Sequence, residues 1–161
     1  MRIPSIYLET TIFNFPFADD SPQYQADTLR LFVEIKEGRF RPFTSEYVLR
    51  ELENTTDIDK LVKMKAMISD YNITVLPPSA EVKRLADVYT LSSVIPAKYG
   101  LDALHIAVAT VAGLDYIVSL NFKHIVKHKT IIETELINAR EGFKRIFIHT
   151  PAEVIENEEN S

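Results

Sequence analysis

The chain has 161 residues, a net charge of −5, 46% hydrophobic and 25% charged residues, and no cysteine. These proportions are those of a globular domain with a hydrophobic core, and the lack of cysteine excludes disulfides and thiolate metal sites. An acidic chain repels nucleic acid overall, so a nucleic-acid site here must depend on local basic groups or on bound metal.

Strand-like and helix-like segments alternate along the whole chain. In chain order, the pattern predicts a strand at 5–8, a helix at 24–38, a strand at 40–44, helices at 45–55 and 57–71, a strand at 73–76, helices at 79–91 and 101–112, a strand at 116–120, a helix at 129–142 and a strand at 145–149. Thr44 or Ser45 is the expected N-cap of the second helix, and Ser79 caps the fourth.

This alternation predicts an α/β fold with a mainly parallel sheet of about five strands and helices on both faces. The strands are short and apolar without a polar side, as expected of strands buried on both faces. In open sheets of this kind, ligands bind beyond the carboxyl ends of the strands, where the strand order reverses.

The apolar segments are too short for a membrane protein. The longest, "ALHIAVATVAGL", cannot cross a bilayer and contains His105, and "MRIPS" lacks the hydrophobic region of a signal peptide. We therefore expect a cytoplasmic protein with no membrane partner. Residues 1–150 are predicted to form one domain, and residues 151–161, which end in "EVIENEENS", a partly disordered tail.

Two polar side chains follow predicted strands at their carboxyl ends. Glu9 comes directly after the strand "SIYL", and Asn121 follows the apolar strand "YIVSL" that ends near Ser119. Both residues have an ordinary explanation, because a carboxylate after a strand can face solvent or cap the next segment, and asparagine is common in turns. Their parallel placement nevertheless favours a shared site at one edge of the sheet.

Asp102 and His105 are the only ionisable side chains between Tyr99 and Asp115. They are three residues apart and therefore share one face of a helix that is otherwise apolar nearly all round. Asp102 could instead be the N-cap of this helix after Gly100. His105 is expected to be a hydrogen-bonding neighbour rather than a metal ligand.

The helix "SEYVLRELENT" places carboxylates next to the core. Its predicted inward stripe is Val48, Leu49 and Leu52. Glu51 and Glu53 flank this stripe on opposite sides, while Glu46 points further away, so helical spacing alone does not choose between Glu51 and Glu53.

The densest basic cluster lies after the strand "YIVSL", in Lys123, His124, Lys127, His128 and Lys129. Such a run is usually a solvated face. Next to an active site, this cluster would supply local positive charge in a chain whose net charge is negative.

The candidate side chains are mostly carboxylates or their amide analogue. Like charges gathered in one cleft are tolerated mainly when a cation neutralises them. An all-oxygen set suits Mg²⁺ or Mn²⁺, which activate water and stabilise phosphoryl transfer. The chain has no glycine-rich phosphate loop, so an ATP-binding function lacks its usual support.

The sequence resembles a PIN domain, the nuclease family that includes the VapC-type toxins of toxin–antitoxin pairs. Four stretches carry the resemblance in the right order: "YLETTIF", "SEYVLREL", "DALHIAVAT" followed by glycine, and "YIVSLNFKHI". The resemblance implies a three-layer α/β/α sandwich and a ribonuclease dependent on Mg²⁺ or Mn²⁺.

The acidic positions of the family fall on Glu9, Glu51 and Asp102, and this alignment chooses Glu51 over Glu53. The fourth position, usually aspartate, falls on Asn121. The chain departs from the family pattern at two positions: Glu9 is one methylene longer than aspartate, and Asn121 offers a neutral carbonyl.

The resemblance therefore implies an endoribonuclease in which Glu9, Glu51 and Asp102 bind the metal and Asn121 orients a water. Thr10, Ser119 and His105 are expected to hydrogen-bond these side chains. Lys123, His124 and Lys127 would lie near the RNA phosphates.

The implied partners are RNA, a second copy of the chain and a small antitoxin. One alternative is a binding module that keeps the fold but has lost hydrolysis, which the two departures and the acidic surface favour. A phosphatase or small-molecule hydrolase is a further alternative, but it would require an aspartate nucleophile at the position of Glu9.

Overall fold

The structure is a computed structural model that describes residues 2–156. Its five strands form one sheet in the order β3-β2-β1-β4-β5, and all four strand pairings are parallel. The strands are β1 (Ser5–Leu8), β2 (Arg41–Ser45), β3 (Thr74–Leu76), β4 (Tyr116–Val118) and β5 (Phe147–His149). The predicted α/β fold with a parallel sheet is confirmed.

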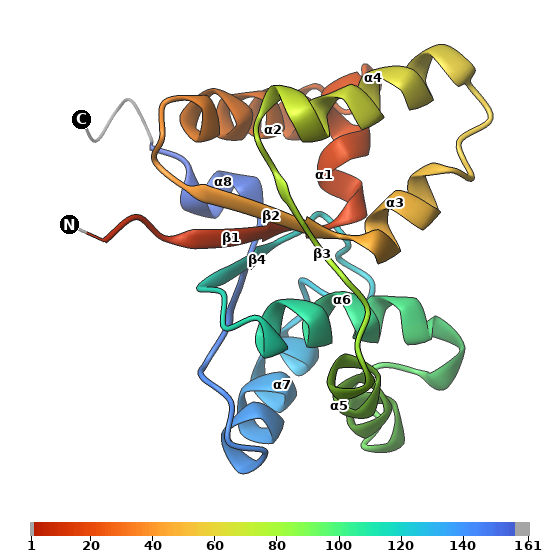
Figure 1. Ribbon diagram of the computed structural model, residues 1–161, viewed down its shortest axis with the longest axis vertical. Coiled ribbons are helices and arrows are strands. Elements are labelled where there is room, and N and C mark those ends of the chain that lie inside the picture. Colours follow the sequence, from red (N-terminus) through yellow and green to blue (C-terminus); the bar gives the residue numbers. More distant parts are fainter. Residues whose placement is uncertain (1, 157–161) are drawn as a thin grey trace.

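Helices cover both faces of the sheet (Figure 1). The helices are α1 (Thr10–Asn14), α2 (Pro22–Lys36), α3 (Glu46–Leu52), α4 (Ile58–Asp70), α5 (Ala80–Leu91), α6 (Gly100–Val111), α7 (His128–Arg140) and α8 (Pro151–Val154). In Figure 1, α2 and α4 lie above the sheet and α5, α6 and α7 below it, which is the expected three-layer arrangement. No helix within residues 2–156 is long and apolar enough to cross a membrane.

The helix that follows β2 begins where its capping residue predicts. The Ser45 hydroxyl accepts a hydrogen bond from the Val48 N–H at 3.4 Å and is therefore the N-cap of α3. The Thr44 hydroxyl instead donates to the Leu8 carbonyl oxygen at 2.9 Å, which ties the end of β2 to the end of β1. These two bonds fix α3 beside the tip of the central strand.

Helix α1 was not predicted. It has five residues, too few for an apolar period to be visible in the sequence, and its N-cap is Glu9, whose carboxylate accepts from the Thr11 N–H at 3.2 Å. The chain therefore turns into a helix immediately after β1. This turn keeps Glu9 at the strand tip instead of releasing it into a loop.

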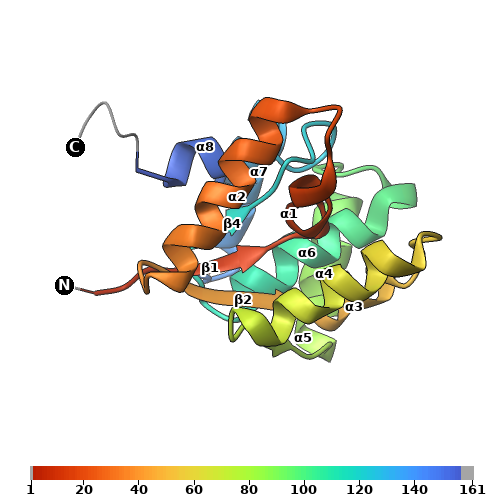
Figure 2. The same cartoon turned by 90° about the horizontal axis from the view of Figure 1, so that it is seen from above.

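The C-terminal segment begins with a helix that packs beside α2 (Figure 2). After α8, the Glu156 N–H donates to the carboxylate of Glu34 at 3.0 Å. Glu34 is fully buried and is also paired with Arg30 and Arg39 at 3.0 Å each. Residues 157–161, the rest of the predicted tail, lie outside the described residues.

Asp115 joins the amino ends of three strands. Its carboxylate accepts from the Ser5 N–H at 2.8 Å, where β1 starts, and from Lys144 at 2.7 Å, shortly before β5. Arg2 pairs with it at 2.6 Å. Burial opposes ionisation of Asp115, but the bonds from Lys144 and Ser5 are stronger and hold its pKa well below the ordinary value.

We expect Asp115 to make stability depend on acid pH. Its contribution is complete above the unfolded pKa of about 3.9 and is lost as pH falls toward the lower folded pKa. The variant Asp115→Asn should be about 1 kcal/mol less stable at pH 7 and should lose less stability between pH 5 and pH 2. Urea denaturation across this range measures both effects, and parallel pH profiles for the two proteins would contradict the assignment.

Candidate active site

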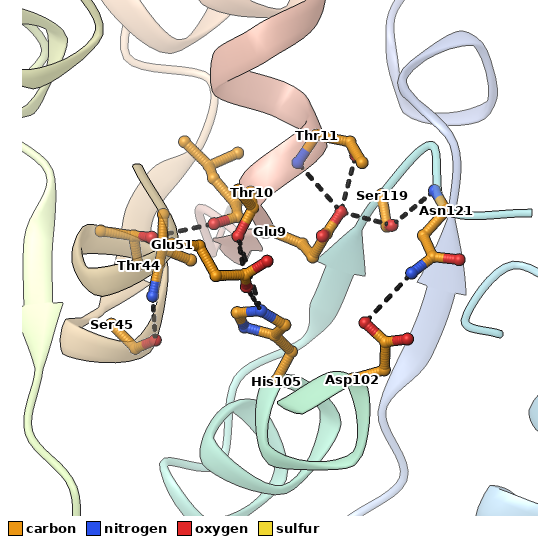
Figure 3. Close-up of polar contacts among 12 residues, drawn as sticks. Glu9, Thr10, Thr11, Thr44, Ser45, Glu51, Asp102, His105, Ser119 and Asn121 are labelled. Carbon is orange, nitrogen blue, oxygen red and sulfur yellow. Dashed lines mark hydrogen bonds and ion pairs between the residues drawn. The ribbon is translucent and has the colours of Figure 1, made fainter. Parts of the chain in front are cut away.

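Four polar side chains from four parts of the fold meet at the carboxyl edge of the sheet (Figure 3). Glu9 follows β1, Asn121 follows β4, Glu51 lies on α3, and Asp102 lies in the first turn of α6. The chain runs outward from β1 to β2 and β3 and then returns to β4 on the other side of β1. The group therefore occupies the point where the strand order reverses, the usual ligand position in such sheets.

Glu9 is only 2% exposed. One of its oxygens accepts hydrogen bonds from the Thr11 hydroxyl at 2.6 Å and the Ser119 hydroxyl at 2.7 Å, besides the Thr11 N–H. Burial raises the pKa of Glu9, and the nearby His105 and these donors offset only part of that rise. Sequence reasoning missed Thr11, although a hydroxyl residue two positions after a carboxylate at a helix start was a visible signal.

Glu51 faces this group, whereas Glu53 does not. Glu51 accepts a hydrogen bond from the Thr10 hydroxyl at 2.8 Å and another from His105. Burial opposes ionisation of Glu51, but the bond and charge of His105 lower its pKa overall. The Glu53 side chain is 54% exposed and pairs with Lys65 at 2.6 Å. The choice that helical spacing left open is therefore settled by the packing of α3.

His105 is fully buried among the acidic side chains. Its Nδ1 lies 2.7 Å from the Tyr7 hydroxyl, which is 2.7 Å from the Ser45 hydroxyl, and its Nε2 contacts Glu51. Burial lowers the pKa of His105, but the Glu51 bond and the charges of Glu9, Glu51 and Asp102 raise it further, so the net direction is upward. The acidic neighbours therefore offset the effect of burial on the pKa of this ring.

Asp102 is not the N-cap of α6, because that position belongs to Tyr99. Its carboxylate instead accepts a hydrogen bond from the Asn121 amide at 3.1 Å. The Asn121 carbonyl oxygen accepts from the His124 N–H at 3.0 Å, so both ends of this amide are engaged. Burial raises the pKa of Asp102, against the opposing effects of His105, His124 and Asn121.

The predicted basic residues lie in the loop after β4 and at the start of α7. Lys123 and Lys127 are exposed, and the His124 ring packs against the Tyr99 ring in a tilted arrangement, with centroids 4.0 Å apart. Lys129 pairs with Glu133 at 3.0 Å within α7. The cluster is therefore divided, and Lys123 and His124 are the members that adjoin Asn121.

The donor set suits a hard divalent cation in chemical type, since Glu9, Glu51 and Asp102 all offer carboxylate oxygens. Burial also raises the pKa of Glu9 and Asp102, as expected for acids whose charge a cation would stabilise. As arranged, however, no three acidic, histidine or cysteine side chains within residues 2–156 are placed to hold a metal ion. Each carboxylate is held by its own protein partners: Ser119, His105 and Asn121.

The fold has a counterpart among solved structures. The chain is similar to one in the crystal structure of VapBC2 from Rickettsia felis bound to a DNA fragment from their promoter, with a TM-score of 0.57 and 15% sequence identity. The match covers 91% of this chain and 98% of the other. No family model and no curated protein matches the sequence. At this identity the likeness shows the fold alone.

We expect the bond from Ser119 to stabilise the fold through Glu9. Removing this donor by Ser119→Ala leaves a buried carboxylate less satisfied and should cost about 1–3 kcal/mol of unfolding free energy. The same change should cost less in a Glu9→Gln background, because the neutral amide needs the donor less. Urea denaturation of the four proteins gives the coupling, and equal costs in both backgrounds would contradict it.

Proposed function

We propose that the protein is a PIN-type endoribonuclease that depends on Mg²⁺ or Mn²⁺. The observation that carries this proposal is the convergence of Glu9, Glu51 and Asp102 at the point of strand-order reversal. The VapBC2-like fold supports it, as do the four PIN-like sequence stretches. The acidic residues would hold the metal, which would activate water and neutralise charge on the phosphate.

The surrounding residues would fix the acidic groups. Thr10 donates to Glu51, and Ser119 donates to Glu9, so each carboxylate keeps one direction in the site. Asn121 holds Asp102 through its amide N–H and is the residue to which we assign orientation of the attacking water. Lys123, His124 and Lys127 would lie near the RNA backbone.

The structural neighbour supports one of the proposed partners, a small antitoxin. That structure is of VapBC2 bound to a DNA fragment from their promoter, and the likeness supports a toxin role for the present chain. We also propose a homodimer and a cytoplasmic location. Residues 1–150 would form the catalytic domain.

A binding module without hydrolysis is the second candidate. The observation that favours it is His105, which lies within the acidic group and already engages Glu51 through a hydrogen bond. Such a protein would bind RNA or another protein at the same edge without any metal.

The first test compares carboxylates that face the site with one that does not. Asp102→Asn and Glu51→Gln should each lower RNA cleavage by about 100-fold and weaken magnesium or manganese binding. Glu53→Gln should keep both, because Glu53 is an exposed partner of Lys65 two residues away from Glu51. Calorimetry and a mixed RNA pool measure the two properties. A wild-type protein that neither binds metal nor cuts RNA would overturn the nuclease proposal and favour the binding module.

A second test introduces, at Asn121, the aspartate that is usual at the fourth position of the PIN-like pattern. In Asn121→Asp, a carboxylate replaces the amide that donates to Asp102, so the metal-free protein should lose about 1–3 kcal/mol of stability. Magnesium should raise the Tm of this variant more than that of the wild type, because a shared cation relieves the new repulsion. Thermal unfolding with magnesium chloride, against potassium chloride at matched ionic strength, measures the difference. Equal magnesium shifts would argue against a cation between these residues.

A further inference from the structure

Aromatic rings occur in the two segments that carry Asn121 and Asp102. Tyr24, in the first turn of α2, and Phe122 are 42% and 45% exposed, with ring centroids 5.6 Å apart. In the segment before Asp102, Tyr99 ends the short 3-10 helix η2 (Ala97–Tyr99), and its ring packs against the His124 ring. We call this surface the aromatic–lysine strip and define it as Tyr24, Phe122, Lys123, His124, Tyr99 and Lys98.

Both parts of the strip are close in the sequence to residues of the site. Phe122 directly follows Asn121, and Tyr99 precedes Asp102 by three residues. The hydrogen bond between Asn121 and Asp102 joins these two segments. The two parts of the strip are therefore connected at the Asn121–Asp102 pair, which belongs to the site.

The lysines of the strip are available to a ligand. Lys98 and Lys123 place their Nζ atoms 5.1 and 5.4 Å from the centroid of the Tyr99 ring. Neither lysine belongs to any ion pair found in residues 2–156. The aromatic ring holds both cations without neutralising them, so their charge remains for an anionic group.

The opposite end of the strip differs in charge. Gln25, next to Tyr24, donates a hydrogen bond to the carboxylate of Asp19 at 2.9 Å. An acid at this end disfavours phosphate, whereas the exposed rings of Tyr24 and Phe122 offer flat surfaces to a base. The strip thus combines a stacking end with a phosphate-binding end.

We propose that the aromatic–lysine strip binds single-stranded RNA, with unpaired bases stacked on Tyr24 and Phe122 and phosphates beside Lys98 and Lys123. This inference rests on the proposed function and names its substrate as unpaired RNA. A duplex does not fit, because its bases already stack on each other and offer no face to the protein rings. The continuity of the strip with the acidic group favours RNA over a protein partner.

The experiment measures binding separately from cleavage. A short single-stranded RNA carrying 2-aminopurine is titrated with the full chain, in EDTA and again in calcium, and its fluorescence anisotropy and quenching are recorded. Tyr24→Ala and Phe122→Ala should each weaken binding about tenfold and reduce the quenching. Tyr24→Phe and Phe122→Tyr keep a ring and should retain both signals. Phe147→Ala, at a ring 40% exposed on the edge strand β5, is the matched control and should bind like the wild type.

The outcomes separate this inference from the proposed function. If the wild-type protein stacks with the RNA but does not cut it, the binding role of the strip is supported and the nuclease proposal fails. If cleavage persists while the alanine variants bind normally, only the proposed role of the strip is overturned.

Two binding results would also overturn the role of the strip. One is the absence of wild-type binding in both buffers, and the other is equal affinity for a hairpin of the same length. A dimer that becomes monomeric in Tyr24→Ala, by sedimentation, would assign the surface to a second copy of the chain and overturn it too.

Discussion

The carboxylate of Glu9, buried at the tip of the central strand, is the constraint on which this edge of the fold depends. Burying a charge is costly unless hydrogen bonds and opposite charge compensate it. The compensation comes from Thr11, in the first turn of α1, and from Ser119, which follows β4. Satisfying one acid therefore fixes where the chain turns after β1 and how the next strand of the sheet ends.

His105 extends the same constraint to the other half of the site. Its two ring nitrogens contact Tyr7 in β1 and Glu51 in α3, and Tyr7 in turn contacts Ser45 at the end of β2. Three segments are thus joined to α6 through one buried ring. These contacts hold the acidic side chains in place, and a metal would have to compete with His105 for Glu51.

The alternation of strands and helices was readable from the sequence because the strands are short, β1 and β4 are mostly apolar, and most helices carry a cap. The positions of Glu9 and Asn121 followed from strand ends alone. Glu51 could be separated from Glu53 only by the family resemblance, because both flank the apolar stripe of α3; the structure shows Glu51 facing the site and Glu53 paired with Lys65. Local periodicity carries no information on which neighbour a helix packs against.

The hydrogen bonds of the site were less predictable, because they join residues far apart in the sequence. The bond from Asn121 to Asp102 spans 19 positions, and that from Ser119 to Glu9 spans 110. An amide at position 121 can donate to an acid where an aspartate would repel it, so the departure from the family pattern has a physical consequence. The Asn121 amide stabilises Asp102 through this hydrogen bond, but it offers a metal no negative charge, whereas an aspartate would.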